Sequence, residues 1–309
     1  MFTRASSAIM ANSQEPDDLP HPQRHNRPRK KRWQYPVAYL LLALVSLANP
    51  VSHADPADQA PVKLNYQLLQ SRPLKSPFFT QGLEIHEGQL LQSSGLYGKS
   101  KLVSRPLNDT AVTAGATWQH ALNKQYFAEG LTVFNNTVYL LSWREQTLWR
   151  FDVATGKLLG RNTYQGEGWG LTNDQQHLIR SDGSDTLFFH DPETLDLKYR
   201  LQVTRNGQAV KNINELEFAQ GLIWANIWFS SEIIAIDPAS GAVKAVVDIA
   251  ELAKRERAHN PDPNAVANGI AFDSRNKSFW VTGKHWSQLY QLRIDTDALT
   301  RPLSKGQHP

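Results

Sequence analysis

The chain has 309 residues, with 33 Lys and Arg against 29 Asp and Glu, and it contains no cysteine. The lack of cysteine excludes disulfides, a thiol nucleophile and a lipid-modified cysteine, so a buried core must stabilise the fold. The length allows one large β domain or two smaller domains.

Residues 1–54 have the pattern of an export signal. A basic block at 24–32 precedes an apolar run at 36–48, and the small residues Ser52 and Ala54 fit the signal-peptidase rule. We therefore expect a signal peptide with a long basic region, cut after Ala54. The run is shorter than the roughly 20 residues of a membrane span, although an uncleaved anchor is the alternative. The protein would then meet the membrane only transiently, during export, and work in the periplasm or as a secreted protein.

The basic surplus of the chain belongs to this leader. Residues 1–54 hold seven of the 33 basic and three of the 29 acidic residues, which leaves 26 of each in the rest. Nucleic acids and anionic membranes bind surfaces with excess positive charge. A neutral mature chain therefore predicts no nucleic-acid partner.

After a polar linker at 55–62 comes a strand at 63–70 without a local partner, and then the sequence repeats itself. Each repeat opens with a short motif: Gln81-Gly82-Leu83, Glu129-Gly130-Leu131, Trp169-Gly170-Leu171, Asn214-Glu215-Leu216 and Asn268-Gly269-Ile270. The motifs start 48, 40, 45 and 54 residues apart. Such a period, with about four strands per unit, is typical of β-propeller blades.

Five units predict an all-β, five-bladed propeller at 63–303, followed by a tail at 304–309. The last unit ends after its third strand, 288–294, so the strand at 63–70 can complete that blade and close the ring. An open sandwich or two small β domains is the alternative, but neither explains the regular period. The only helix expected is an insertion between blades at 248–259.

The stretch 127–143 predicts a β-hairpin whose turn is Asn135-Asn136, because asparagine tolerates the positive φ of tight hairpin turns. This hairpin brings Glu129 and Trp143 to one edge. A carboxyl group beside an indole is partly desolvated, which raises its pKa and lets it hold a proton near neutral pH. Glu129 is therefore a candidate acid/base.

The repeat also predicts where a site would lie. Equivalent positions in a symmetric fold occupy equivalent places, so the motif starts and the ends of the second strands should meet at one mouth of the central channel. The two rings contain Gln81, Glu129, Trp169, Asn214 and Asn268, and then Ser94, Trp143, Asp182, Trp228 and Lys284. A scaffold would repeat one residue type, whereas these residues differ, which indicates a binding site.

Separated strings in these repeats resemble the plant-type glutaminyl-peptide cyclotransferases. They are PFFTQGLE (77–84), SSGLYGKS (93–100), FAEGLT (127–132), GEGWGLT (166–172), NELE (214–217) with IWANIW (223–228), and NGIAFD (268–273) with VTGKHW (281–286). The resemblance implies a five-bladed propeller that converts the N-terminal glutamine of peptides or proteins into pyroglutamate and releases ammonia. It also implies a catalytic acid/base, Glu129, with the pocket partners Phe79, Gln81, Trp143, Trp169, Asn214, Trp228 and Lys284.

The residue types suit this chemistry. The α-amine of the substrate attacks its own side-chain amide, so the protein mainly fixes one folded conformer between three indoles and Phe79. The carboxyl group of Glu129 can move a proton from the attacking to the departing nitrogen. Asn214 and Gln81 offer amide donors and acceptors, and Lys284 can stabilise developing negative charge.

Several of these residues have structural alternatives. Glu129 and Lys284 can form a buried ion pair. Asn268 can serve only to hydrogen-bond a neighbouring blade, and Asp182 fits a turn as well as a ligand site. Three further indoles lie inside strands and are expected to pack within blades: Trp149, Trp224 and Trp280.

No cofactor and no metal site are expected. The ten histidines form no HxH or HExxH pattern, and no Gly-rich phosphate loop is present. We predict a monomeric, metal-independent enzyme. A propeller that binds peptides or sugars without catalysis and a metal-dependent propeller lactonase or hydrolase are the alternatives.

Overall fold

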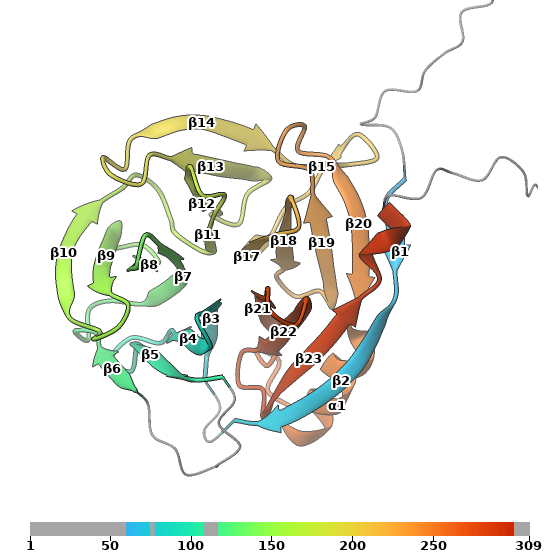
Figure 1. Ribbon diagram of the computed structural model, residues 1–309, viewed down its shortest axis with the longest axis horizontal. Helices are drawn as coiled ribbons and strands as arrows, with labels where there is room; N and C mark the ends of the chain where they lie inside the picture. The colour runs from blue at the N-terminus through green and yellow to red at the C-terminus, as the bar shows by residue number, and fades with distance from the viewer. Residues whose placement is uncertain (1–59, 75–77, 108–116, 300–309) are drawn as a thin grey trace, which may run out of the picture. The chain divides into compact units, whose positions relative to one another are not determined.

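The computed structural model describes residues 60–74, 78–107 and 117–299 (Figure 1). These residues belong to one compact unit, Ser52–Pro309. The expected signal peptide, its cleavage site and the tail at 304–309 lie outside the described residues. Within the described ranges, none of the helices has the length and apolar character needed to cross a bilayer.

The described strands form five main sheets around a central axis, which confirms the predicted five-bladed propeller (Figure 1). Blade 1 contains β3 (Thr80–His86), β4 (Gln89–Ser94), β5 (Lys101–Pro106) and β6 (Trp118–Ala121). Blade 2 contains β7 (Ala128–Phe134), β8 (Thr137–Ser142), β9 (Thr147–Asp152) and β10 (Leu158–Thr163). Blade 3 contains β11 (Leu171–Asn173), β12 (Leu178–Arg180), β13 (Thr186–His190) and β14 (Leu197–Gln202).

Blade 4 follows a small hairpin of β15 (Thr204–Arg205) and β16 (Gln208–Ala209), and contains β17 (Ile213–Ala219), β18 (Leu222–Ile227), β19 (Glu232–Ile236) and β20 (Val243–Asp248). Blade 5 contains β21 (Ala267–Asp273), β22 (Ser278–Gly283) and β23 (Gln288–Ile294), followed by a short 3-10 helix, η2 (Thr296–Leu299). The inner strands β3, β7, β11, β17 and β21 contact one another in sequence, and β21 contacts β3. The ring is therefore closed.

The N-terminal strands join two blades. The single strand expected at 63–70 is divided at Asn65: β1 (Val62–Leu64) pairs in parallel with β20, and β2 (Tyr66–Pro73) pairs antiparallel with β23. The carbonyl of Asn65 accepts the N–H of Asp295 at 3.1 Å. The expected pairing with the last strand is confirmed, and the same segment also extends blade 4.

The hairpin turn, the inserted helix and the packing indoles agree with expectation. Asn135 and Asn136 have φ values of 46° and 59°, as a tight turn between β7 and β8 requires. Helix α1 (Ala250–His259) lies between blades 4 and 5, and the Asp248 carboxylate accepts the N–H of Ala250 at 2.9 Å. Three strand indoles are buried inside the blades: Trp149, Trp224 and Trp280.

Glycines allow the inner strands to approach each other closely. A Cβ on Gly130 would lie 2.4 Å from the backbone nitrogen of Leu171, and one on Gly170 would lie 2.0 Å from the carbonyl oxygen of Asn214. Neither gap holds a side chain. This contact explains why glycine recurs at the second place of the repeated motif.

In blade 4 the same place is taken by Glu215, which is fully buried. Its carboxylate reaches two other inner strands, where it accepts the N–H of Leu83 on β3 at 3.1 Å and of Ile270 on β21 at 2.8 Å. Burial raises the pKa of Glu215 well above its usual range, against the opposing effect of these two bonds. Glu215 therefore links blades 4, 5 and 1 by hydrogen bonds, whereas the glycines at the same motif position in other blades only allow close packing.

We predict that Gly130→Ala lowers the free energy of unfolding by about 3 kcal/mol, because the new methyl group would overlap the backbone of the next blade. Gly221→Ala is the control, since Gly221 has a φ of +78° and a Cβ added there would meet no atom within 4 Å. That change should cost only about 1 kcal/mol of backbone strain. Denaturant unfolding followed by tryptophan fluorescence measures both losses, and equal losses would contradict the close-packing account.

Candidate active site

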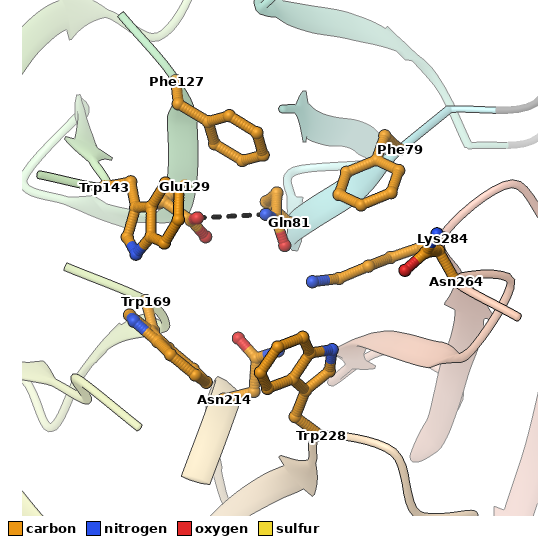
Figure 2. Close-up of a pocket in the computed structure, with 10 residues that line it drawn as sticks. All are labelled: Phe79, Gln81, Phe127, Glu129, Trp143, Trp169, Asn214, Trp228, Asn264 and Lys284. Atoms are coloured by element: carbon orange, nitrogen blue, oxygen red, sulfur yellow. Dashed lines mark hydrogen bonds between the residues drawn. The ribbon is translucent and has the colours of Figure 1, made fainter. Parts of the chain in front are cut away.

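One mouth of the ring contains a pocket to which every blade contributes (Figure 2). It is lined by Phe79, Gln81, Phe127, Glu129, Trp143, Trp169, Asn214, Trp228, Asn264 and Lys284. The structure thus brings together Glu129 and all seven of its expected pocket partners. Phe127 and Asn264 are additional members.

Glu129, near the start of β7, provides the carboxyl group of the pocket and is only 5% exposed. Its Oε1 accepts a hydrogen bond from Gln81 Nε2 at 3.0 Å. In the described part of the chain Oε2 accepts no hydrogen bond, so it is available to a bound substrate. The backbone carbonyl of Glu129 accepts a bond from Ser93 Oγ at 2.5 Å, which fixes the residue from the neighbouring blade.

Burial raises the pKa of Glu129 well above its ordinary value, because the ionised form has lost most of its hydration. The positive charge of Lys284 opposes this shift, and the negative charges of Glu167 and Glu145 add to it. The carboxyl group consequently holds a proton more readily than an ordinary glutamate does, which suits a group that accepts and releases protons.

Lys284 directly follows β22 and extends its side chain into the pocket. An isolated β-bridge between its backbone and that of Phe79 holds it in place. Its ammonium lies 5.1 Å from the ring centroid of Phe79 and 5.7 Å from that of Trp228. Burial lowers its pKa, while the charge of Glu129 works in the opposite direction. Among the described ion pairs there is none between Lys284 and Glu129, so the structural-pair alternative is not what the geometry shows.

Asn268 supports the pocket without lining it. Its Nδ2 donates to the Thr80 carbonyl at 2.9 Å and to Gln81 Oε1 at 3.4 Å. Because Oε1 of Gln81 faces a donor, its Nε2 is the end that points to Glu129. Asn268 therefore makes the expected contact with a neighbouring blade and also orients the Gln81 amide.

Asp182 lies outside the pocket lining. Its Oδ1 accepts the N–H of Ser184 at 3.0 Å, which is the geometry of a turn-forming aspartate. The turn interpretation of the SDGSD segment is therefore the one that the structure favours.

A second carboxylate, Glu167, holds two of the indole walls. Its Oε2 accepts the indole N–H of Trp143 at 2.8 Å and of Trp169 at 3.0 Å, and its Oε1 contacts Arg144 Nε at 3.0 Å. Partial burial would raise its pKa, but the bonds from Trp169, Trp143 and Arg144 lower it below the ordinary value. The Arg144 guanidinium lies 3.7 Å from the Trp143 ring centroid and covers the same indole.

Three residues of this neighbourhood were not expected from the sequence. Phe127 and Glu167 stand two positions before Glu129 and Trp169, and residues two apart on an extended chain share a face, so this spacing could have indicated them. Asn264 lies in the irregular segment after α1. It has no periodic signal in the sequence.

The protein is thus a five-bladed propeller that holds a buried carboxyl group among indoles at one mouth of its channel. The sequence model of the glutamine cyclotransferase family matches residues 39–294. The curated glutaminyl-peptide cyclotransferase of Arabidopsis thaliana is 33% identical over 219 residues, which are 70% of this chain and 67% of that protein. The crystal structure of Myxococcus xanthus glutaminyl cyclase is 36% identical, with a TM-score of 0.69 over 76% of this chain and 98% of that one. The chain belongs to the glutamine cyclotransferase family.

We predict that Glu167→Ala loosens both indole walls, because two partly buried N–H groups lose their acceptor. Near-ultraviolet circular dichroism should show a weaker tryptophan signal, and KM for a Gln-peptide should rise about tenfold with a smaller change in kcat. Glu193→Ala, at an exposed outer turn, is the control. An unchanged tryptophan signal together with an unchanged KM would show that Glu167 does not position the indoles.

Proposed function

We propose that this pocket converts the N-terminal glutamine of peptides or proteins into pyroglutamate, with Glu129 as the acid/base. The observation that carries the proposal is a single buried carboxyl group with a raised pKa, set among aromatic walls and facing Lys284 and Asn214 across the pocket (Figure 2). The family membership of the chain supports the same reaction.

The reaction requires one proton to move. The α-amine nitrogen attacks the carbonyl carbon of the side-chain amide, and a tetrahedral intermediate forms with a cationic nitrogen and an anionic oxygen. Glu129 accepts the proton from this nitrogen and delivers it to the amide nitrogen, which leaves as ammonia when its bond to carbon breaks. A carboxyl group with a raised pKa suits both transfers.

The other pocket residues position the substrate and stabilise charge. Trp143, Trp169 and Trp228 line the pocket, where they can hold the glutamine side chain in one folded conformer. Asn214 and Lys284 are placed to stabilise the anionic oxygen. Burial lowers the pKa of Lys284. Its positive charge in turn disfavours protonation of the attacking amine, which must stay neutral.

We further propose that the reaction needs no metal, that one chain suffices, and that the protein is exported to the periplasm or beyond. The pocket supports the first two points, since a single chain supplies all its described walls and no described group of three or more His, Cys, Asp or Glu could hold a metal ion. The basic block and apolar run before Ala54 support export.

We predict that Glu129→Gln lowers kcat for cyclisation of a Gln-peptide about a thousandfold while the fold is retained. Coupled detection of ammonia and mass spectrometry of the product measure the reaction, and Glu193→Gln is the exposed control. Activity should persist in a strong chelator. Retained turnover in the Glu129 variant would remove this residue from the mechanism, and loss of wild-type activity with chelator would instead favour a metal-dependent enzyme.

The acid limb of the pH profile of kcat/KM should report ionisation of Glu129, because activity falls when the proton acceptor is already protonated. Lys284→Met removes the charge that holds the pKa of Glu129 down, so this limb should move to higher pH. Glu167→Gln removes a charge that raises the pKa, so the limb should move to lower pH. The substrate amine titrates identically in all three proteins, and shifts in the same direction would contradict the assignment.

A further inference from the structure

Large apolar or aromatic side chains are exposed at a few described positions: Tyr97, Leu158, Leu159, Leu197, Tyr199 and Phe229. Four of them lie on the outer strands β10 and β14, away from the channel. Tyr97 and Phe229 differ from these four because each of them touches an aromatic ring that lines the pocket.

Phe229 occupies a position that is unfavourable for a phenylalanine. It is 61% exposed and has a φ of 62°, in a turn closed by the Ser230 N–H to the Ile227 carbonyl at 2.9 Å. Glycine or asparagine adopts this left-handed backbone more readily, and a bulky residue there is strained. Neither the exposed ring nor the strained backbone helps folding, and such strain concentrates at functional sites.

The ring of Phe229 extends one wall of the pocket outward. It stacks on Trp228 with 4.4 Å between centroids and an interplanar angle of 29°. Trp228 is a lining residue, so the exposed ring of Phe229 packs directly on one wall of the pocket.

Tyr97 packs on another wall of the pocket. Its ring lies 5.4 Å from that of Phe127, and it is 49% exposed. The Tyr97 hydroxyl donates to Glu145 Oε1 at 2.8 Å, which fixes the ring. Phe127 and Trp228 lie on opposite sides of the pocket in Figure 2, so the two exposed rings continue opposite walls.

If the proposed function holds, a substrate places its first residue in the pocket and its chain must leave through the mouth. The second residue of the substrate then lies beside the rim of the pocket, where Tyr97 and Phe229 are exposed. We infer that Tyr97 and Phe229 form an apolar subsite for the side chain of the residue that follows the N-terminal glutamine. This subsite selects aromatic or large aliphatic side chains, because burying such a side chain against two rings removes apolar surface from water.

The test compares Gln-Phe-amide with Gln-Gly-amide as substrates of the wild-type protein, Phe229→Gly and Tyr97→Ala. The wild type should prefer Gln-Phe-amide, and each rim variant should lower kcat/KM for this peptide about tenfold, mainly through KM, with little change for Gln-Gly-amide. Tyr199→Ala is the control, because Tyr199 is also exposed but lies on β14. Phe229→Gly relieves the strained backbone, so its thermal midpoint should not fall and unfolding cannot explain its loss of affinity.

A ratio between the two peptides that is unchanged in both rim variants would overturn the inference and leave the cyclisation itself intact. A change in only one variant would assign the subsite to that ring. Failure of the wild type to release ammonia from either peptide would overturn the proposed function instead, so the two failures are distinguishable.

Discussion

The close approach of neighbouring inner strands is the constraint on which the pocket depends. Gly82, Gly130 and Gly170 stand where no side chain fits between adjacent backbones. Each of them directly follows a pocket residue, Gln81, Glu129 or Trp169. The contact that packs one blade against the next therefore also sets the distance between functional side chains. Stability of the ring and geometry of the site cannot vary independently at these positions.

Side chains of one blade also fix functional residues of the next. Ser93 Oγ donates to the carbonyl of Glu129 at 2.5 Å, and Ser181 Oγ donates to the carbonyl of Asn214 at 2.6 Å. Both serines are fully buried, so these bonds are made in a region of low dielectric constant. The backbones of Glu129 and Asn214 are thus held in place without a bound substrate. Such preorganisation is what an intramolecular cyclisation needs from a protein.

The sequence predicts the ring better than it predicts the supporting contacts. Repeat spacing and the turn at Asn135-Asn136 are local signals, and they were sufficient for the blades, the closing strand and the inserted helix. Seven of the eight predicted pocket residues follow from the same symmetry, and Phe79 was indicated only by the family resemblance. The symmetry also names Ser94, Asp182 and Asn268, which do not line the pocket. Asn264 and the two-blade pairing around Asn65 depend on contacts between distant segments, which no local pattern records. The hydrogen bonds of Glu215 to other blades were also not predictable from the sequence. Glu215 stands at the motif position that is glycine in the other blades, and the pattern does not show where its side chain reaches.

Three buried or partly buried glutamates show how surroundings assign different tasks to one residue type. Glu215 accepts two backbone N–H groups and has a structural role, whereas Glu167 accepts two indole N–H groups beside Arg144 and has a lowered pKa. Glu129 has Gln81 as its donor, and its nearby cation, Lys284, makes no direct ion pair with it. A direct pair would hold the carboxylate ionised and occupy the oxygen that a substrate must reach. In the proposed mechanism, the separation of the two charges keeps the proton of Glu129 transferable and leaves the space between them for the reacting atoms.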